Sequence, residues 1–313
     1  MDVTAPAPSA ASGVALITAV LITAVIAIAA VAMASQQVLA VRRTANVIDS
    51  DRAYVFALGV ESWAQQVLLR DKRSSQTDAL GEDWALHLPP IAVEGAVVTG
   101  HIEDLQGRFN LNNLVDASGK ASPLDLQRFR TLLMVVGLDP GLTDAVVDWI
   151  DPDSDVTQPD GAEDPDYLRA QVPYRAANGP MVSASELLMV KGFTADAYQK
   201  LAPYVTALPQ GTAINVNTAS APVLMALATG ITDNDAAALI SARGDKGFAS
   251  VAEFTAQQAL AGRGVSQQGL SVASDYFLLD ADARFGRGQT HLYSVMARST
   301  SGVTTLLRGQ GAY

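Results

Sequence analysis

The residues from Val14 to Ala34 form an apolar run in which only Thr18 and Thr23 carry a polar side-chain atom. An α-helix rises 1.5 Å per residue, so about 20 such residues cross about 30 Å of hydrocarbon. A cleaved secretory signal is the alternative, but its apolar part usually spans only about 7 to 15 residues. The run therefore predicts one transmembrane helix.

The helical pattern continues beyond this run. Residues 35–70 contain no Pro and only Gly59, and apolar side chains recur at the spacing of one helical face. These side chains are Val38, Val41, Ala45, Ile48, Ala53, Phe56, Val60, Trp63 and Val67. One helix from Val14 to about Leu69 would be on the order of 85 Å long. Such a rod is typical of a membrane anchor with a stalk, or of a packing spine in a filament.

The composition excludes several classes of function. The chain has 32 Asp and Glu against 21 Lys and Arg, a net charge of −11, whereas a nucleic-acid binder needs a basic face. With no cysteine, a metal must be held by oxygen or by one of three histidines, His87, His101 and His291, which are scattered along the sequence and are expected to be structural or exposed. The motifs G-x-S-x-G and H-E-x-x-H are absent from the sequence, so we do not expect the chain to be an enzyme.

The remaining chain divides by pattern into a sheet and a helical insert. Residues 93–111 are rich in Val and Ile and alternate, and the chain from Asp275 onward carries three such segments separated by Gly-containing turns. Between them, residues 123–260 show short helical patterns broken by Gly, Pro and Asp. The sequence therefore predicts an α+β fold with an antiparallel sheet and a large inserted α-helical domain.

The insert contains a weak internal repeat. Phe109–Asn112 and Ile214–Asn217 each precede a helix, a glycine and a second helix, and residues 183–205 repeat the helix, glycine, helix step. Such helix-hairpin-helix-like units can bind DNA through backbone amides. In a chain this acidic we expect them to serve helical packing, with no nucleic-acid partner.

The densest group of carboxylates lies between residues 148 and 166, and no Lys or Arg occurs between Arg130 and Arg169. The group comprises Asp148, Asp151, Asp153, Asp155, Asp160, Glu163, Asp164 and Asp166. Like charges this close repel one another unless solvent or a cation screens them, and Ca²⁺ accepts about six to eight oxygens at variable geometry. A solvated acidic surface is the other interpretation, but the apolar neighbours Trp149, Ile150 and Tyr167 favour an ordered loop.

We therefore predict a calcium loop that holds one or two ions. The expected first ligands are Asp151, Asp153, Glu163 and Asp164, and the possible further ligands are Asp148, Asp155 and Asp160. The loop is not an EF-hand, because Val156 stands where that motif needs Gly and Ala162 where it needs Glu.

A short leader ends at Gly13, directly before the apolar helix that starts at Val14, and distinctive segments follow along the chain. These segments are Gly107–Asn112, Asp148–Asp151 with Gly161–Asp164, Pro173–Asn178, Ser185–Leu187 and Ile214–Ala219. The amino end resembles the processing site of type IV pilins and type II secretion pseudopilins. Together the motifs are similar to those of the general secretion pathway protein K family of minor pseudopilins.

This resemblance implies a pseudopilin fold, in which a long N-terminal helix packs on an antiparallel sheet, with a calcium-binding α domain inserted. It implies that a prepilin peptidase cuts between Gly13 and Val14. It also implies a place at the tip of the type II secretion pseudopilus with minor pseudopilins I and J, where the chain initiates assembly and contributes to protein export across the outer membrane. Secreted cargo and other secretion components are further expected partners.

The resemblance gives Thr18 a role in filament packing. Most pilin-like proteins carry Glu four residues beyond the cut residue, where its charge can neutralise the buried amine of a neighbouring subunit. Thr18 stands at that position here. A subunit that enters the filament first has no earlier amine to neutralise, so this substitution is typical of a cap.

We accordingly expect a leader over residues 1–13, a transmembrane helix over 14–34, an amphipathic helix with the first strands over 35–122, the inserted domain over 123–272 and the last strands over 273–313. The family pattern implies a single-pass protein of the inner membrane with its C-terminal domain in the periplasm. Arg42 and Arg43 follow the apolar run and the leader has no Lys or Arg, so the positive-inside rule alone would place this domain in the cytoplasm. The alternative function is a membrane-anchored periplasmic metal-dependent enzyme or adhesin.

Overall fold

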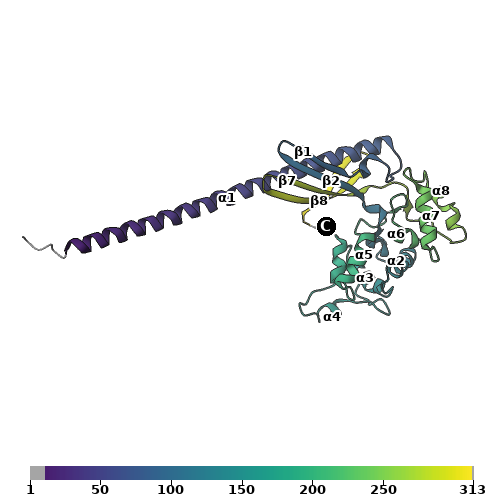
Figure 1. The fold of residues 1–313 in the computed structure, drawn as a ribbon. Coiled ribbons are helices and arrows are strands. Elements are labelled where there is room, and N and C mark those ends of the chain that lie inside the picture. Colours follow the sequence, from purple (N-terminus) through teal and green to yellow (C-terminus); the bar gives the residue numbers. More distant parts are fainter. Residues whose placement is uncertain (1–10, 312–313) are drawn as a thin grey trace, which may run out of the picture.

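The computed structural model describes residues 11–311, so residues 1–10 of the predicted leader lie outside it. Its dominant element is α1 (Ala11–Ser74), which projects from the head of the molecule as one continuous rod (Figure 1). Every side chain from Val14 to Ile48 is exposed. By length and composition, α1 is the one helix of the described chain that could cross a membrane.

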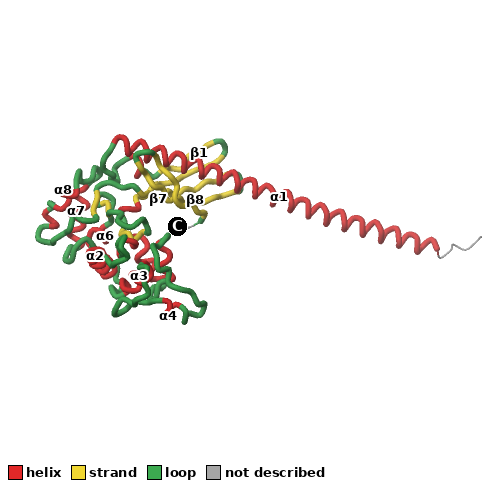
Figure 2. The backbone as a smooth tube through the Cα atoms, turned by 180° about the vertical axis from the view of Figure 1, so that it is seen from behind, coloured by secondary structure: helices red, strands yellow, loops and turns green. Residues whose placement is uncertain are grey.

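The head begins where α1 meets a five-stranded antiparallel sheet. The strands are β1 (Leu88–Val93), β2 (Ala96–Asp104), β7 (Tyr276–Phe285), β8 (Gly288–Ser299) and β9 (Gly302–Gln310), in the spatial order β1-β2-β7-β8-β9. Segments far apart in sequence thus pair directly, because β2 lies against β7 in unbroken register from Ala96 with Phe285 to Asp104 with Phe277. Figure 2 shows α1 lying across this sheet.

The helix packs on the sheet through a narrow stripe of small residues. Ala53, Ala57 and Ala64 are fully buried, with Val60 and Leu68 beside them. Alanine side chains let the helix backbone approach the strands closely, so bulkier residues are left at the flanks of the contact. The predicted helix is confirmed, and Ala53 and Val60 of its apolar stripe lie in this contact. Trp63 of the same stripe remains 42% exposed, and the positions from Val38 to Ile48 are exposed, so their packing in a filament stays a prediction.

Polar contacts fix the position of the helix along the sheet. Glu61 of α1 is buried and accepts hydrogen bonds from Ser294 of β8 and, through both carboxylate oxygens, from Arg308 of β9 at 2.6 and 2.9 Å. Nearer the amino end, the β7–β8 turn lies directly against the backbone of Asp49, where Gly288 leaves no space for a side chain. Within residues 11–311, every side chain of α1 from Val14 to Ile48 is therefore left exposed.

The inserted domain lies between β2 and β7 in the chain, and in Figure 1 it lies below the sheet and extends past the end of α1 that is away from its free half. Its helices are short and surround a separate apolar core. The α-helices are α2 (Pro123–Val135), α3 (Leu142–Ile150), α4 (Asp164–Tyr167), α5 (Ala195–Leu201), α6 (Ala221–Met225), α7 (Asp233–Arg243) and α8 (Val251–Thr255). The two-residue strands β3 (Phe109–Asn110) and β4 (Val205–Thr206) pair in parallel, as do β5 (Ile214–Asn215) and β6 (Leu270–Ser271).

The boundary of this domain differs from the predicted one. Phe109, Leu111 and Leu114 belong to the core of the inserted domain, although the sequence pattern placed them with the first strands. The change from sheet to insert therefore comes directly after Asp104, where a 3₁₀ turn (Leu105–Gly107) ends β2.

The internal repeat has a structural counterpart. Asn112 donates to the carbonyl of Met181 and accepts from its amide at 2.9 and 2.7 Å. Asn217 forms the same pair of bonds with Phe248, at 3.0 and 2.7 Å. In both units a fully buried asparagine side chain thus pairs with backbone as a neighbouring strand would. The repeated asparagines are packing devices, in accord with the expected helical packing.

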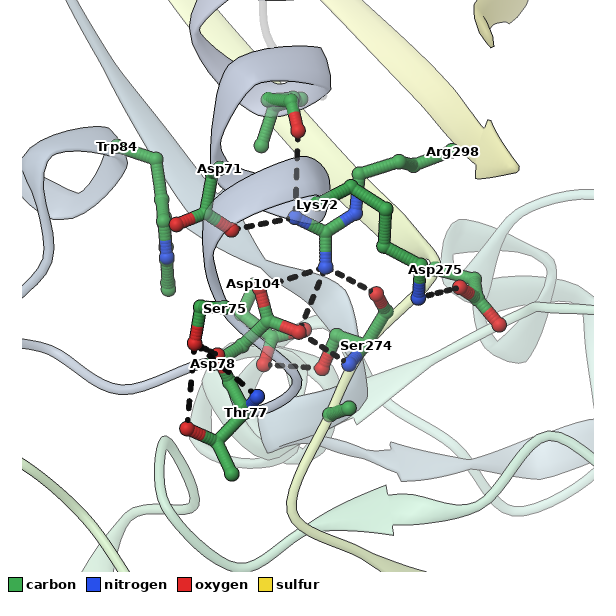
Figure 3. Close-up of polar contacts among 12 residues, drawn as sticks. Asp71, Lys72, Ser75, Thr77, Asp78, Trp84, Asp104, Ser274, Asp275 and Arg298 are labelled. Atoms are coloured by element: carbon green, nitrogen blue, oxygen red, sulfur yellow. Dashed lines mark hydrogen bonds and ion pairs between the residues drawn. The ribbon is translucent and has the colours of Figure 1, made fainter. Parts of the chain in front are cut away.

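A buried arginine joins the helix, the sheet and the chain that returns from the insert (Figure 3). Arg298 of β8 is 3% exposed and donates to both oxygens of Asp78 at 2.6 Å, to Asp71 of α1 at 2.7 Å and to the carbonyl of Ser274 at 2.6 Å. The bidentate pair of Arg298 with Asp78 tolerates burial because its charges and hydrogen bonds offset the lost hydration. Burial raises the pKa of Asp71 to about 6, although the hydrogen bond from Arg298 opposes this shift.

Asp104 extends this junction into the inserted domain. Its carboxylate accepts from Ser274, Thr218 and Asn215 at 2.6 to 2.9 Å, and Asn215 also donates to the carbonyl of Asp78. Burial raises the pKa of Asp104 to about 6, and the hydrogen bonds from Ser274 and Thr218 oppose this shift. One connected polar network therefore ties the insert to the end of α1.

Replacing Arg298 tests the weight of this network. Arg298→Met leaves Asp78 buried without its counter-charge, so we expect the free energy of unfolding to fall by about 3 to 5 kcal/mol. Urea denaturation of the purified full chain in detergent measures this loss. Lys72→Met is the matched control, because it removes a partly exposed ion pair with Asp275, and surface pairs contribute about 0 to 1 kcal/mol. Equal losses in the two variants would contradict the assignment.

Candidate metal centre

The acidic loop starts at the end of α3, a helix that is buried from Thr143 to Ile150. Asp148 in its last turn is fully buried and accepts hydrogen bonds from the amides of Thr157 and Ala162 at 3.0 and 2.7 Å. The loop therefore folds around this carboxylate. Burial raises the pKa of Asp148, and the hydrogen bonds from Thr157 and Ala162 oppose the shift.

Three of the predicted ligands converge inside this loop. One carboxylate oxygen each from Asp151, Asp153 and Glu163 lies within 4.8 Å of the other two. Asp151 is 6% exposed and Glu163 is 1% exposed. Buried carboxylate oxygens normally have hydrogen-bond partners, yet one oxygen of Asp151 and both of Glu163 have none among the described residues. The donor set is all oxygen and negatively charged, which fits a hard divalent cation such as Ca²⁺.

The pKa shifts of Asp151 and Glu163 also indicate that these carboxylates lack a compensating positive charge among the described residues. Burial, followed by the charges of Asp153 and Asp148, raises the pKa of Asp151 to about 7. Burial, followed by the charge of Asp148, raises the pKa of Glu163 to about 6. Without a cation the folded loop therefore favours protonation, because two buried negative charges repel each other in a poorly solvated space.

The other predicted ligands lie around this trio rather than in it. The backbone amide of Asp155 donates to Asp153 at 2.8 Å, while the Asp155 side chain is exposed. Asp160 is also exposed and lies against Gly141. Asp164 accepts from the amide of Ala176 and forms an ion pair with Arg175 at 3.2 Å. Metal binding by any of these residues stays a prediction.

A further oxygen at the loop was missed by the sequence reasoning. Asn178 donates to the carbonyl of Asp153 at 2.7 Å, and its own buried side-chain oxygen has no hydrogen-bond partner among the described residues. Its φ of 44° lies in the left-handed region, which Asn tolerates better than most residues. This residue lies well beyond the acidic segment in sequence, so no local charge pattern points to it.

Aromatic rings close one side of the loop. Trp149 packs edge-on against Tyr167, with ring centroids 5.3 Å apart, and its indole nitrogen donates to Glu186 at 3.2 Å. Glu186 also completes a capping box with Ser183. These contacts confirm that the loop is ordered against a core, as its apolar neighbours predicted.

The predicted processing and packing residues lie at the opposite end of the molecule. Gly13 and Val14 are in the first turns of α1, which begins at Ala11. The hydroxyl of Thr18 donates to the carbonyls of Val14 and Ala15, each at 3.0 Å. Its polar group is thus satisfied within its own helix, as an apolar environment requires.

Comparison with known proteins gives consistent matches. Residues 107–210 and 214–273 each match a family model described as type II secretion system (T2SS), protein K. The Type II secretion system protein K of Pseudomonas aeruginosa is 37% identical, over 96% of this chain and 93% of its own length. That of Pectobacterium carotovorum is 34% identical, over 88% of both chains.

A solved structure matches as well. A chain of the GspK-GspI-GspJ complex from the type 2 secretion system of enterotoxigenic Escherichia coli aligns with a TM-score of 0.78 and 29% identity. The alignment covers 87% of this chain and all of the matched one. This likeness confirms the predicted combination of a long N-terminal helix, an antiparallel sheet and a helical insert.

Neutralising the two buried ligands separates metal binding from packing. In the double variant Asp151→Asn, Glu163→Gln we expect calcium to lose its stabilising effect, while the calcium-free form melts at the same or a higher temperature, because the buried repulsion is gone. Thermal melts of the full chain in detergent, with calcium and with a chelator, measure both effects. The matched control is Asp166→Asn, which lies on the adjacent α4 and pairs with Lys191. A calcium response equal to that of the unmodified chain would rule out this centre.

Proton competition gives a second prediction. Unfolded carboxyl groups titrate near pH 4, whereas Asp151 titrates near 7 and Glu163 near 6 in the folded loop. Between about pH 4 and pH 7 the folded state therefore holds more protons than the unfolded state, so the stability of the metal-free chain falls as the pH rises across this interval. Calcium must displace these protons, so its affinity rises over the same interval. Calcium titrations at several pH values test this, and a flat profile would contradict the shifts.

Proposed function

We propose that this chain, which belongs to the type II secretion system protein K family, lies at the tip of the pseudopilus. Members of this family are minor pseudopilins that act in protein secretion, and we start from that role. The single observation that carries the proposal is the division of α1. Its carboxyl half is packed on the sheet, and its amino half, from Val14 to Ile48, is apolar or uncharged over most of its length and has no partner in the described chain.

The free half of α1 serves as an anchor and then as a spine. It spans about 50 Å at 1.5 Å per residue, more than the roughly 30 Å of a bilayer core. Lipid covers it before assembly, and the corresponding helices of other pseudopilins cover it afterwards. Thr18 suits both environments, because its hydroxyl is satisfied within α1 and it brings no charge into an apolar contact.

The inserted domain makes this subunit a cap. It lies beside the sheet and extends past the end of α1 that is away from the free half (Figure 1), where we place the stacking position of the next subunit of a growing filament. Subunits can therefore be added below this chain but not above it. A protein with this shape enters first and initiates assembly. Its exposed inserted domain, which we call the crown, is the part that meets secreted cargo and other secretion components.

The proposed partners come from the likeness to a solved complex. The matched solved chain comes from a complex with GspI and GspJ, and this chain assembles in the same way with the minor pseudopilins I and J. A prepilin peptidase first cuts after Gly13, which leaves Val14 as the amino-terminal residue. The protein then resides in the inner membrane with its head in the periplasm. The net charge of −11 argues against a nucleic-acid partner.

Calcium is the proposed structural cofactor of the crown. Asp151, Asp153 and Glu163 would hold it, with Asn178 adjacent. When bound, the ion supplies positive charge that offsets the buried repulsion and joins the two ends of the acidic loop. The loop is then a structural element and not an active site.

Photo-crosslinking in living cells tests the spine. A photoreactive residue at Leu21, which is 64% exposed on the free half of α1, is expected to crosslink to the N-terminal helix of pseudopilin I. The control position is Val172, 77% exposed on the crown, which is expected not to crosslink to that helix. Both variants must restore secretion in a strain that lacks this chain. If Leu21 yields only lipid adducts in a secreting cell, or a chain without residues 14–34 keeps full function, the alternative of an anchored enzyme or adhesin is favoured.

A further inference from the structure

The face of the sheet turned away from α1 carries a cluster of two carboxylates and one imidazole that has no part in the proposed function. Residues alternate along β7, so Ala281 and Ala283 face the helix while Asp280 and Asp282 face the other way. On β8, Leu292 faces the helix and His291 does not. Because Asp282 and His291 are register partners, strand pairing alone places these side chains together.

The imidazole of His291 lies between the two carboxylates. Its Nδ1 is 3.4 Å from an oxygen of Asp282, and its Nε2 is 3.6 Å from an oxygen of Asp280. One ligand atom from each of the three residues lies within 4.8 Å of the other two. An imidazole binds one ion through one nitrogen, so only one of these two contacts can lie within a shared coordination shell. Two ligands about 2.1 Å from a tetrahedral ion are about 3.4 Å apart, which matches the separation between Nδ1 of His291 and Asp282.

The charges at this cluster are not balanced by the chain. Within residues 11–311, His291 is the only basic side chain within ion-pair distance of Asp280 or Asp282, and it is charged only if protonated. His101 stands opposite Asp280 on β2, but its Nε2 contacts Glu103 at 3.0 Å. Two neighbouring carboxylates on a rigid pair of strands thus share one imidazole, and a cation would relieve their repulsion.

We infer that Asp280, Asp282 and His291 form a second metal site, which binds a divalent transition metal ion, with Zn²⁺ as the fitting example. The imidazole decides the class of ion, because Ca²⁺ and Mg²⁺ prefer all-oxygen shells whereas Zn²⁺ combines imidazole with carboxylate. Side chains of the three residues are 33 to 38% exposed, so water completes the shell.

The position of the site gives it a role in the stiffness of the head. Leu278 and Val295, on the same face of β7 and β8, pack with Leu105 and with Leu208 of the inserted domain. Zinc at these three residues would therefore link β7 to β8 next to the apolar contact between the sheet and the inserted domain. This inference does not depend on the proposed place of the chain in the filament.

Zinc titration of the purified, untagged full chain in detergent tests the site. Saturating calcium is present throughout, so that the acidic loop does not take up zinc. Isothermal titration calorimetry measures affinity, and Co²⁺ absorption spectra report whether nitrogen and oxygen ligate the ion. We expect one zinc per chain, and we expect His291→Gln and Asp282→Asn each to weaken binding by more than about tenfold, since losing even an outer-shell partner costs about 10- to 100-fold.

The matched control is His101→Gln, which removes an imidazole from the same sheet face, one strand away. It is expected to leave zinc affinity unchanged. Far-ultraviolet circular dichroism and metal-free melting temperatures verify that all three variants fold. No zinc binding by the unmodified chain, equal affinity in His291→Gln, or an equal loss in His101→Gln would each overturn the assignment.

Discussion

The constraint on which the rest of the structure depends is that the amino half of α1 cannot be buried within its own chain. Apolar surface on this scale is stable only in lipid or against other helices. The sequence from Val14 to Ala34 is apolar apart from two threonines, and all side chains from Val14 to Ile48 are exposed. The amino half of α1 therefore needs lipid or other helices around it, and the chain belongs to a family of minor pseudopilins that act in protein secretion.

The carboxyl half of α1 is held firmly against the sheet of the head. Alanines at positions 53, 57 and 64 bring α1 onto the sheet, Glu61 fixes its position along the strands, and Arg298 locks its end to the returning chain. Asp104 carries the same network into the inserted domain through Asn215. The crown is thus held to the spine by buried polar contacts, whose geometry is more specific than that of apolar packing. Force or motion along the spine would reach the crown without an intervening flexible linker.

Much of this could be predicted from the sequence, because the relevant signals are local. The apolar run predicted the rod, the alternation after Asp275 predicted the last three strands, and the density of carboxylates predicted the acidic loop. What could not be predicted depends on contacts between segments that are apart in the sequence. Asp148 holds the loop backbone through the amides of Thr157 and Ala162, and Asn178 contacts the loop from beyond the acidic segment. The pairing of β2, β7 and β8 brings together on one face four residues that are scattered in the sequence, namely His101, Asp280, Asp282 and His291. The unexpected exposure of Trp63 has the same cause, since only the sheet shows that small residues must face it.

The position of the crown in the filament tests the account most directly. The chain contains no cysteine, so a single cysteine at the exposed position Val172 can be labelled with gold without competing thiols. Electron microscopy of pseudopili assembled with this variant then shows where the subunit lies. Our account predicts one gold particle at one end of each filament and none along its shaft. Particles distributed along the length would contradict a capping subunit.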